Sequence, residues 1–463
     1  MTALIVILIV GILALLSEVL NFKKFLYPLS IIGILLAIVM NVQEWSHPFS
    51  WKYSDNMIMF DSLALAFSNV LLVTVLLWFM MSKSYFSEET NLVEHTSLVL
   101  FSLIGALMLV SFNNLVSLFL GIEILSIPLY VLAASNKKNI LSNEAGFKYL
   151  IMGSFASGFL LFGIALLYGA SGSFDLSIIQ STLSTDRVPL FAYTGIVMIL
   201  IALGFKVSLA PFHFWTPDVY EGSPVVITAL MSTIVKTSVF VAIMKLFLWY
   251  FYPAYNHYVE LVSILILISL VIANFSALKQ TNIKRLLAFS SISHASIMML
   301  LIIADLRNAS TVNALLYYTF AYSIASIAAF AVVQFVSQNN NEQLDLLKGL
   351  IYQQPYLAVS LIIALLSMAG IPVTAGFFAK YYVLSALMVS SYKWMVIVAL
   401  LASVLSIVYY FKLILVMFET SNKQKATHPI TLNNREWALL FICLILLVIT
   451  GVYPDIIANT FVR

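Results

Sequence analysis

The stretch LGFKVSLAPFHFWTPDVYEGSPVVITALMSTIVKTSVF (residues 203–240) decides the fold, because it places charges inside apolar sequence. Lys206 and Lys236 each lie in a run long enough to cross a membrane. A charge near the bilayer centre costs roughly 2.5–3.5 kcal/mol on insertion scales, so each one needs a reason. Lys380, in GIPVTAGFFAKYYVL, and Glu123, in LGIEILSIPL, extend the pattern to two more runs. A row of such groups on several helices is what a proton path through a membrane requires.

The composition points to a polytopic membrane protein. The chain has 463 residues, of which 62% are hydrophobic and 9% are charged, whereas a soluble domain carries about 25% charged residues. The net charge of +3 gives no indication of nucleic acid binding. The single cysteine, Cys443, excludes a disulfide framework and a cysteine-ligated cluster or zinc site. Nucleotide and metal-site motifs are absent, so we expect no cofactor in this chain.

Apolar runs of the length that a helix needs to cross about 30 Å of hydrocarbon follow one another along the chain. The first lacks a basic segment before it, so it is interpreted as a retained span rather than a signal peptide. The fourteen predicted spans are 2–20, 24–42, 57–81, 95–112, 115–134, 147–169, 190–211, 224–250, 258–278, 283–304, 309–337, 355–385, 393–418 and 436–455.

The basic residues of the short loops predict the orientation, since the richer side is cytoplasmic. One side carries twelve, namely Lys23, Lys24, Lys83, Lys137, Lys138, Lys279, Lys284, Arg285, Lys348, Lys423, Lys425 and Arg435. The other carries five, namely Lys52, Arg187, Arg307, Lys393 and Arg463. We therefore expect both termini on the outer side of the membrane.

Two predicted spans are interrupted. The seventh carries Pro211 after Lys206, and the twelfth carries Gly370, Pro372 and Gly376 before Lys380. Proline breaks helices, and a broken backbone at membrane depth lies in protein or lines a watery cavity. Interrupted segments five spans apart predict an inverted repeat, with spans 4–8 matching spans 9–13. The expected fold is all-α, with segments 1–94 (three helices), 95–250 and 258–418 (the two repeats) and 419–463 (a last helix).

The chain from about His95 to Glu419 resembles the antiporter-like membrane subunits of respiratory complex I, which are similar to Mrp-type cation/proton antiporter subunits. The stretch KYLIMGSFASGFLLFGIALLYGASG is most similar to the subunit N members of this family in bacterial NADH–quinone oxidoreductase. Lys380 agrees, because subunit M members tend to carry glutamate there. The matching motifs are GIEILSIPLYVL, GFKYLIMGSFASGFLLFGIALLYGASGS, LGFKVSLAPFHFWTPDVYEGSPVVITALMSTIVKTSVF, NIKRLLAFSSISHASIMML and MAGIPVTAGFFAKYYVL.

This resemblance implies a multi-pass subunit of the bacterial inner membrane that moves protons outward. NADH, FMN, iron–sulfur clusters and quinone would be handled by partner subunits, and this chain would contain none of them. The implied partners are neighbouring antiporter-like subunits, small membrane subunits and the lipid bilayer, with no nucleic acid. Two alternatives stay open. One is an Mrp-type sodium/proton antiporter subunit that has no redox partner, and the other is a membrane scaffold that moves no proton.

The resemblance implies that Glu123 and Lys206 face each other across the fifth and seventh spans. A nearby carboxylate favours a protonated lysine and burial disfavours it, so a change in this pair would change the proton affinity of Lys206. The alternative is an ion pair that only fixes helix packing. Lys236 is the implied central site, with Ser232, Thr233, Thr237 and Ser238 nearby. It lies roughly 18 Å from either end of its span, too far for the charge to snorkel to the surface.

Lys380 is implied to exchange protons with the outer side, and the alternative is a snorkelling lysine. His294 would bridge Lys236 and Lys380, since histidine relays protons through its two ring nitrogens; the alternative is a hydrogen-bonded packing residue. His213, seven residues after Lys206, is a further candidate.

Glu144 and Lys148 are either a proton uptake path or a solvated surface pair. Lys284 and Arg285 are interpreted as topology signals, Asp218 and Glu221 as a loop cap, and Lys412 as a snorkelling lysine.

Overall fold

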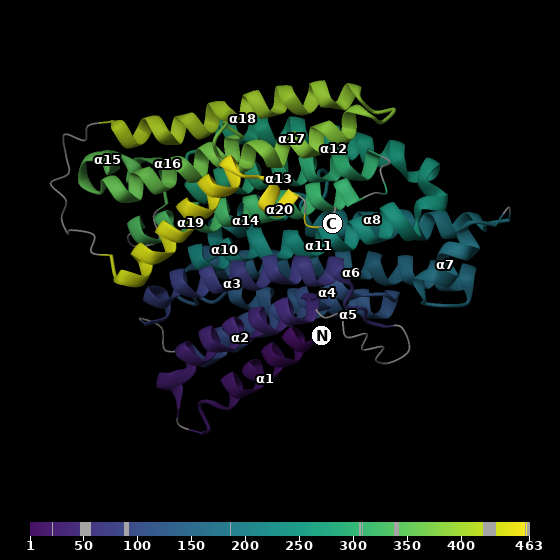
Figure 1. Ribbon diagram of the computed structural model, residues 1–463, viewed down its shortest axis with the longest axis horizontal. Helices are drawn as coiled ribbons and strands as arrows, with labels where there is room; N and C mark the ends of the chain where they lie inside the picture. Colours follow the sequence, from purple (N-terminus) through teal and green to yellow (C-terminus); the bar gives the residue numbers. More distant parts are fainter. Residues whose placement is uncertain are drawn as a thin grey trace. The chain divides into compact units, whose positions relative to one another are not determined.

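The computed structural model describes residues 1–20, 22–46, 57–87, 92–185, 187–304, 307, 309–337, 342–419, 432–458 and 460. Within these ranges the chain is helical, and the only β-type pairings are isolated bridges (Figure 1). Eleven of the described helices are long and apolar enough to cross a membrane, and four shorter apolar helices accompany them. The prediction of an all-helical membrane protein is therefore confirmed. Lys52, Lys423, Lys425 and Arg463 lie outside the described residues.

The helices fall into two compact units, which are described separately. Unit 1 comprises residues 1–208 and 234–262, and unit 2 comprises residues 209–233 and 263–463. Unit 1 contains α1 (Thr2–Leu16), α2 (Leu26–Ser46), α3 (Ser62–Ser87), α4 (Leu92–Ser111), α5 (Leu115–Ala133), α6 (Ile140–Ser171), α7 (Leu176–Leu183), α8 (Leu190–Lys206) and α11 (Lys236–Met244), with short turns at Lys23–Phe25 and Tyr252–Ala254.

Unit 2 contains α9 (Trp215–Gly222), α10 (Val225–Leu230), α13 (Ile283–Ile303), α14 (Ala309–Val336), α15 (Leu350–Gln353), α16 (Pro355–Ala369), α17 (Ala375–Met388), α18 (Trp394–Phe418), α19 (Asn434–Val452) and α20 (Asp455–Ala458), with a 3₁₀ turn at Leu344–Leu347. Helix α12 (Tyr255–Leu278) begins in unit 1 and continues in unit 2. The four sequence segments predicted above have other boundaries. Grouping by spatial proximity does not test the predicted repeat, which stays a prediction.

Asparagine and aspartate side chains start several of these helices. Asn114 accepts from the backbone N–H of Val116 at the start of α5, and Asn282 does so for Arg285 at the start of α13. Such caps satisfy amide groups that have no partner inside the helix. Asn433 and Glu436 form a reciprocal capping box at α19. Polar residues between the apolar runs therefore set where the helices begin.

The membrane-length helices differ in burial. The apolar stretches of the continuous helical segment Val225–Tyr250 and of helix α13 are fully buried, with only Trp249, Tyr250 and Arg285 partly exposed, whereas about two thirds of α6 is at the surface. In unit 1, α4 packs on α5 and α6 on α8, and in unit 2 α14 packs on α16, α17 and α19. The surface of α6, with Phe147, Phe155 and Phe162 exposed, is apolar and suits a lipid or protein neighbour. The two fully buried segments carry Lys236 and His294.

Candidate functional site

Lys206 is the last residue of α8 and lies against α5. Its Nζ donates hydrogen bonds to Ser126 Oγ at 2.8 Å and to Tyr130 Oη at 2.9 Å. The ammonium also lies 5.3 Å from the centroid of the Tyr130 ring, within cation–π range. Ser126 and Tyr130 follow Glu123 by three and seven residues, so all three side chains share one face of α5. The lysine therefore contacts the stripe of α5 that carries the carboxylate.

The expected ion pair between Glu123 and Lys206 is not formed among the described contacts. Glu123 instead accepts a 2.5 Å hydrogen bond from Ser157 Oγ on α6, and Lys206 binds one turn further along α5. Hydroxyl groups on α5 and α6 thus satisfy the two charges separately. Ser126, Tyr130 and Ser157 were not predicted. The spacing from Glu123 could have indicated the first two, but Ser157 comes from another helix.

Gly153 on α6 makes room for the Tyr130 hydroxyl. A Cβ atom built on Gly153 would lie 2.2 Å from Tyr130 Oη, closer than any real contact allows. The Tyr130 ring also packs edge-on against Tyr149, with centroids 4.7 Å apart. Helix α6 therefore acts on both members of the expected ion pair. It binds Glu123 through Ser157, and it supports Tyr130, which in turn binds Lys206.

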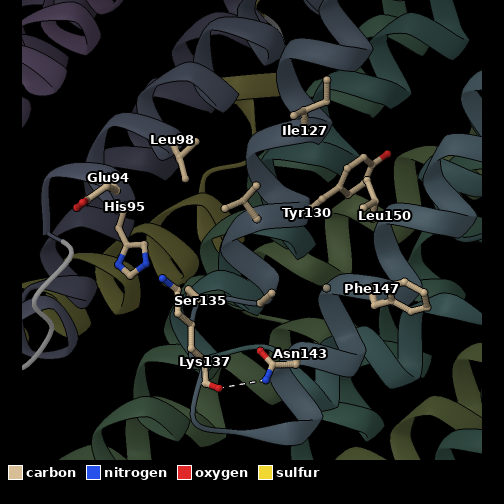
Figure 2. A pocket seen from close by; sticks show the side chains of 13 residues that line it. Glu94, His95, Leu98, Ile127, Tyr130, Ser135, Lys137, Asn143, Phe147 and Leu150 are labelled. Atoms are coloured by element: carbon tan, nitrogen blue, oxygen red, sulfur yellow. Dashed lines mark hydrogen bonds between the residues drawn. The ribbon is translucent and has the colours of Figure 1, made fainter.

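A pocket of about 670 Å³ opens between α4, α5 and α6. Figure 2 shows Glu94 and His95 of α4 on one side and Tyr130 across from them. Tyr130 lines this pocket and also accepts a hydrogen bond from Lys206, so the Tyr130 side chain links the pocket to Lys206. Lys137 and Asn143 line the same pocket and are joined by a hydrogen bond between the Lys137 carbonyl and the Asn143 amide.

Glu144 and Lys148 form an i,i+4 ion pair at 2.7 Å on the surface of α6. Their side chains are 51% and 38% exposed, so the pair is solvated. Asn143 and Phe147, their neighbours in sequence, line the pocket described above. The pair therefore lies beside a candidate uptake route without being part of its lining.

Lys236 is only 2% exposed. It opens α11 directly after a π-helical turn, Met231–Val235. Single π-helical turns widen a helix and re-aim its side chains, and they occur often at functional sites. The hydroxyl groups of Ser232, Thr233 and Ser238 donate to backbone carbonyls of their own helix. Three of the four hydroxyl residues near Lys236 in the sequence therefore bond to the backbone of their own helix.

His294 lies on α13 between two tyrosine hydroxyl groups. Its Nδ1 is 2.8 Å from Tyr318 Oη and its Nε2 is 3.1 Å from Tyr410 Oη. Tyr410 also shares a hydrogen bond with Ser290, one turn before the histidine. Both ring nitrogens are thus in one continuous row of hydroxyl groups. The two tyrosines were not predicted, because they come from other helices, α14 and α18.

A cavity of about 10 Å³ lies beside His294 and Tyr318. Its other wall includes Ser367, near the end of α16, and Gly376, near the start of α17. A volume of about 10–15 Å³ is the minimum that holds one water molecule. The cavity is therefore at the lower limit of size for one water molecule, and its lining extends from the histidine to the interruption that precedes Lys380.

Lys380 is 8% exposed and turns back toward that interruption. Its Nζ donates a 2.8 Å hydrogen bond to the carbonyl of Ala369, the last residue of α16. A helix C-terminus carries partial negative charge and favours a cation. Gly370 then ends the helix at φ 84°, in the left-handed region that suits glycine. The side chain does not reach outward, so the snorkelling alternative does not describe it.

His213 lies in the irregular connection between α8 and α9. The imidazole is buried and packs on Phe214, with ring centroids 4.6 Å apart. Its Nδ1 has no hydrogen-bond partner among the described residues. This connection also holds a cis Ala210–Pro211 peptide and a positive φ at Ser208.

Several charges interpreted as simple topology signals form a network in unit 2. Lys284 is buried, donates to the Ser223 carbonyl at 2.9 Å and pairs with Glu342 at 3.3 Å. Arg285 pairs with Asp218 at 2.7 Å and with Glu221 at 2.9 Å. These contacts join α9 to the start of α13, so the interpretation of Asp218 and Glu221 as a loop cap is incomplete. Lys412 donates to the Gln280 carbonyl at 3.0 Å, just after the end of α12, and its snorkelling stays a prediction.

Comparison with known proteins places this geometry in a family. A family model described as "NADH:quinone oxidoreductase/Mrp antiporter, TM" matches residues 112–406. NADH-quinone oxidoreductase subunit N of Flavobacterium psychrophilum is 42% identical over 460 residues, which cover 99% of each chain. The subunit N protein of Cytophaga hutchinsonii is 40% identical and covers 99% of this chain and 98% of its own length.

Two solved structures share the fold. A chain in respiratory complex I from Thermus thermophilus with bound aureothin matches with a TM-score of 0.85 at 30% identity, over 99% of this chain and 98% of that one. A chain of an archaeal membrane-bound sulfane sulfur reductase matches with a TM-score of 0.89 at 26% identity, over 99% and 95%. The chain therefore belongs to the NADH:quinone oxidoreductase/Mrp antiporter transmembrane family.

Proposed function

We propose that this chain is the subunit N-type proton-translocating membrane subunit of a bacterial NADH–quinone oxidoreductase, or complex I. One observation carries the proposal. Lys206, Lys236 and Lys380 are all buried, and each is associated with an irregularity in a helix. Lys206 is the last residue of α8, Lys236 follows a π-helical turn, and Lys380 on α17 binds the carbonyl that ends α16. Ionisable groups inside a membrane protein are costly and mark ion pathways. The full-length similarity to proteins named subunit N supports the assignment to this complex.

We further propose fourteen spans with an inverted repeat of spans 4–8 and 9–13. Helices are present within each predicted run, and α16 and α17 together occupy the twelfth. Counting α8 and α9 as parts of an interrupted seventh segment follows the same reasoning. The basic residues then put both termini on the outer side of the inner membrane. This orientation makes the pocket between α4, α5 and α6 a cytoplasmic opening.

In the proposed cycle, protons enter through that pocket and reach Lys206 and then Lys236. Lys206 can be held in two ways. It binds Ser126 and Tyr130 as seen, or it moves about one helical turn along α5 to pair with Glu123. Pairing with the carboxylate would favour its protonated form, and separation would release that preference. The observed arrangement corresponds to the separated state.

The proposed onward transfer runs from Lys236 to His294 and then to Lys380. This order follows the family resemblance rather than any contact between the two units. Within unit 2, the hydroxyl row around His294 and the small cavity beside it offer groups that hold and pass a proton. His213, Glu144 and Lys148 are proposed as secondary candidates on the uptake side.

NADH oxidation and quinone reduction would take place in partner subunits, which hold FMN and the iron–sulfur clusters. Neighbouring antiporter-like subunits and small membrane subunits are the proposed partners in the membrane. The exposed apolar surfaces of α6 and α18 are of the kind that such neighbours or lipid would cover. This chain then contributes proton movement to an oxidoreductase without holding a redox centre.

Lys236→Ala in the assembled complex tests the central assignment. We expect the proton-to-electron ratio to fall, because no other ionisable group replaces the central lysine. Lys348→Ala is a matched control, since Lys348 forms an exposed ion pair with Asp345 outside the membrane-length helices. Normal NADH oxidation together with a normal proton-to-electron ratio in Lys236→Ala would show that Lys236 is not the central site.

The alternative is a subunit of an Mrp-type cation/proton antiporter, which the description of the matching family also covers. Purification of the chain from its native membrane separates the two. A complex I subunit will co-purify with flavin and iron–sulfur absorbance and NADH oxidation. An antiporter subunit will show neither and will exchange sodium for protons. A scaffold without transport would retain the redox activity and leave the proton-to-electron ratio unchanged in all the lysine variants.

A further inference from the structure

Lys245 is a further buried lysine that the proposed cycle does not use. It lies nine residues after Lys236 in the same continuous helical segment and is only 4% exposed. A π-helical turn begins at this residue and ends at Tyr250. The turn brings the segment against the end of unit 1 where α4 finishes and α5 begins.

Three interactions favour a charged Lys245 in spite of its burial. The Nζ donates a 2.8 Å hydrogen bond to the Val110 carbonyl in the last turn of α4, where the helix dipole is negative. The Phe112 ring centroid lies 5.5 Å from the same ammonium, within cation–π range. The Asp61 carboxylate, just before α3, lies close enough to attract it. These three interactions stabilise the ammonium of Lys245 against the cost of burying it, and none of them involves Lys236.

Backbone hydrogen bonds join residues 57–61, 110–115 and 173–175 of unit 1 beside Lys245. The side chains of Lys245 and Tyr250 also bind the segment 110–115, and we call these four groups of residues the plug. The Met59 N–H donates to the Ser111 carbonyl at 2.7 Å, and the Leu115 N–H donates to the Phe174 carbonyl at 3.0 Å. Tyr250 donates a hydrogen bond to Asn113 Oδ1 at 2.8 Å. Most polar groups in the plug therefore already have partners within it.

We propose that Lys245 is an electrostatic seal that keeps protons from leaking past Lys236 through this end of unit 1. A fixed cation in a narrow polar region repels a hydronium ion or a proton moving along water, as positive groups do in proton-excluding channels. A low effective dielectric strengthens this repulsion relative to water. The inference rests on the proposed function, because it requires that Lys236 carries protons. It adds that the end of unit 1 beside Lys245 must be closed to those protons.

Two substitutions at Lys245 separate charge from anchoring. Lys245→Gln keeps a hydrogen-bond donor for the Val110 carbonyl but removes the charge, and Lys245→Arg keeps both. The intact complex is reconstituted in liposomes without NADH, and the decay of an imposed pH gradient is followed with a pH-sensitive dye. We expect the gradient to decay about tenfold faster with Lys245→Gln, the ratio that corresponds to about 1.4 kcal/mol. Lys245→Arg should match the unmodified complex.

Further variants guard against loss of assembly and against a packing explanation. Asn113→Asp adds a negative charge beside the plug while Lys245 stays in place, and it too should speed the decay. Tyr250→Phe removes the hydrogen bond to Asn113 but keeps the cation, and it should stay tight. The proposal is overturned if the neutral and acidic variants are as tight as the unmodified complex. It is equally overturned if Lys245→Arg or Tyr250→Phe leaks as much as Lys245→Gln.

Because the leak is measured without turnover, it does not depend on the outcome for Lys236→Ala. A normal proton-to-electron ratio in Lys236→Ala would contradict the proposed function, and the leak measurements would remain valid. Liposomes that hold their pH gradient with Lys245→Gln would contradict the proposed seal, and the proposed function would be unaffected.

Discussion

Lys206 and Lys380 both lie at an interruption between helices, but different kinds of partner hold them. Lys206 donates to two side-chain hydroxyl groups on α5. Lys380 donates to a backbone carbonyl at the end of α16, the helix just before its own. Side-chain partners depend on how α5 and α6 pack, whereas a helix end is fixed by the backbone. The first lysine is therefore easy to rearrange, and the second is held in one place.

The largest expected effect comes from Gly153→Ala, which attacks the packing around Lys206. The new Cβ would meet Tyr130 Oη, so Tyr130 must move and Lys206 loses a partner. Overpacking of this kind costs about 1–3 kcal/mol. We expect most proton pumping to be lost while the complex still assembles. Gly158→Ala on the same helix is the control, because a Cβ there meets nothing within 4 Å. Equal pumping by the two variants would contradict the role given to Tyr130.

The next effect is expected from Gly370→Ala, which changes the break beside Lys380. Alanine at φ 84° costs about 1–2 kcal/mol, and its Cβ would lie 2.9 Å from Lys380 Cδ. We expect a lower melting temperature and a reduced proton-to-electron ratio. Gly349→Ala carries similar backbone strain at φ 74° but lies far in sequence from the lysine and has no close contact. If both variants pump equally well, the close approach of Gly370 to Lys380 does not matter for proton transfer.

A smaller effect should follow from Tyr130→Phe. This change removes one of the two acceptors of the Lys206 ammonium, at a cost of about 1 kcal/mol, and leaves the Ser126 hydroxyl in place. We expect a partial loss of pumping that the double variant with Ser126→Ala makes complete. Measurement of the proton-to-electron ratio in the single and double variants decides this. Full activity of the double variant would show that these hydroxyl groups do not hold Lys206 during turnover.

The smallest effect is expected from Lys148→Gln. Its ion pair with Glu144 is exposed, and such pairs contribute about 0.3–0.5 kcal/mol. We expect normal stability and nearly normal proton pumping in the assembled complex. A large loss of pumping with unchanged assembly would instead make this pair part of the uptake path.

The sequence predicts the helices well because their signal is local. Runs of apolar residues and the polar caps between them, such as Asn114 and Asn282, determine where helices lie. The burial of Lys206, Lys236 and Lys380 was also predicted, since a charge within an apolar run is visible in the sequence. The two π-helical turns around Lys236 and Lys245 were not predicted, because they arise from how the segment packs rather than from its composition.

The partners of the charged groups could not be predicted for the same reason. Ser157, Tyr318 and Tyr410 meet their partners only through tertiary packing, from helices distant in sequence. Lys245 was overlooked because it stands near the end of its span, where a lysine is usually an interfacial residue. Its burial follows from α4 and the residues before α3, which no local pattern reveals.

The row of Tyr318, His294, Tyr410 and Ser290 has a consequence for the rhythm of transfer. A neutral imidazole has one N–H and one bare nitrogen, so the hydrogen bonds along the row all have a direction. When a proton enters at one end and another leaves at the far end, every bond along the row reverses its direction. A second proton cannot follow the same way until the hydroxyl groups rotate and the histidine tautomer is restored. If protons pass along this row as proposed, the row must be reset after each transfer, and the time of that reset is a lower limit on the interval between successive protons.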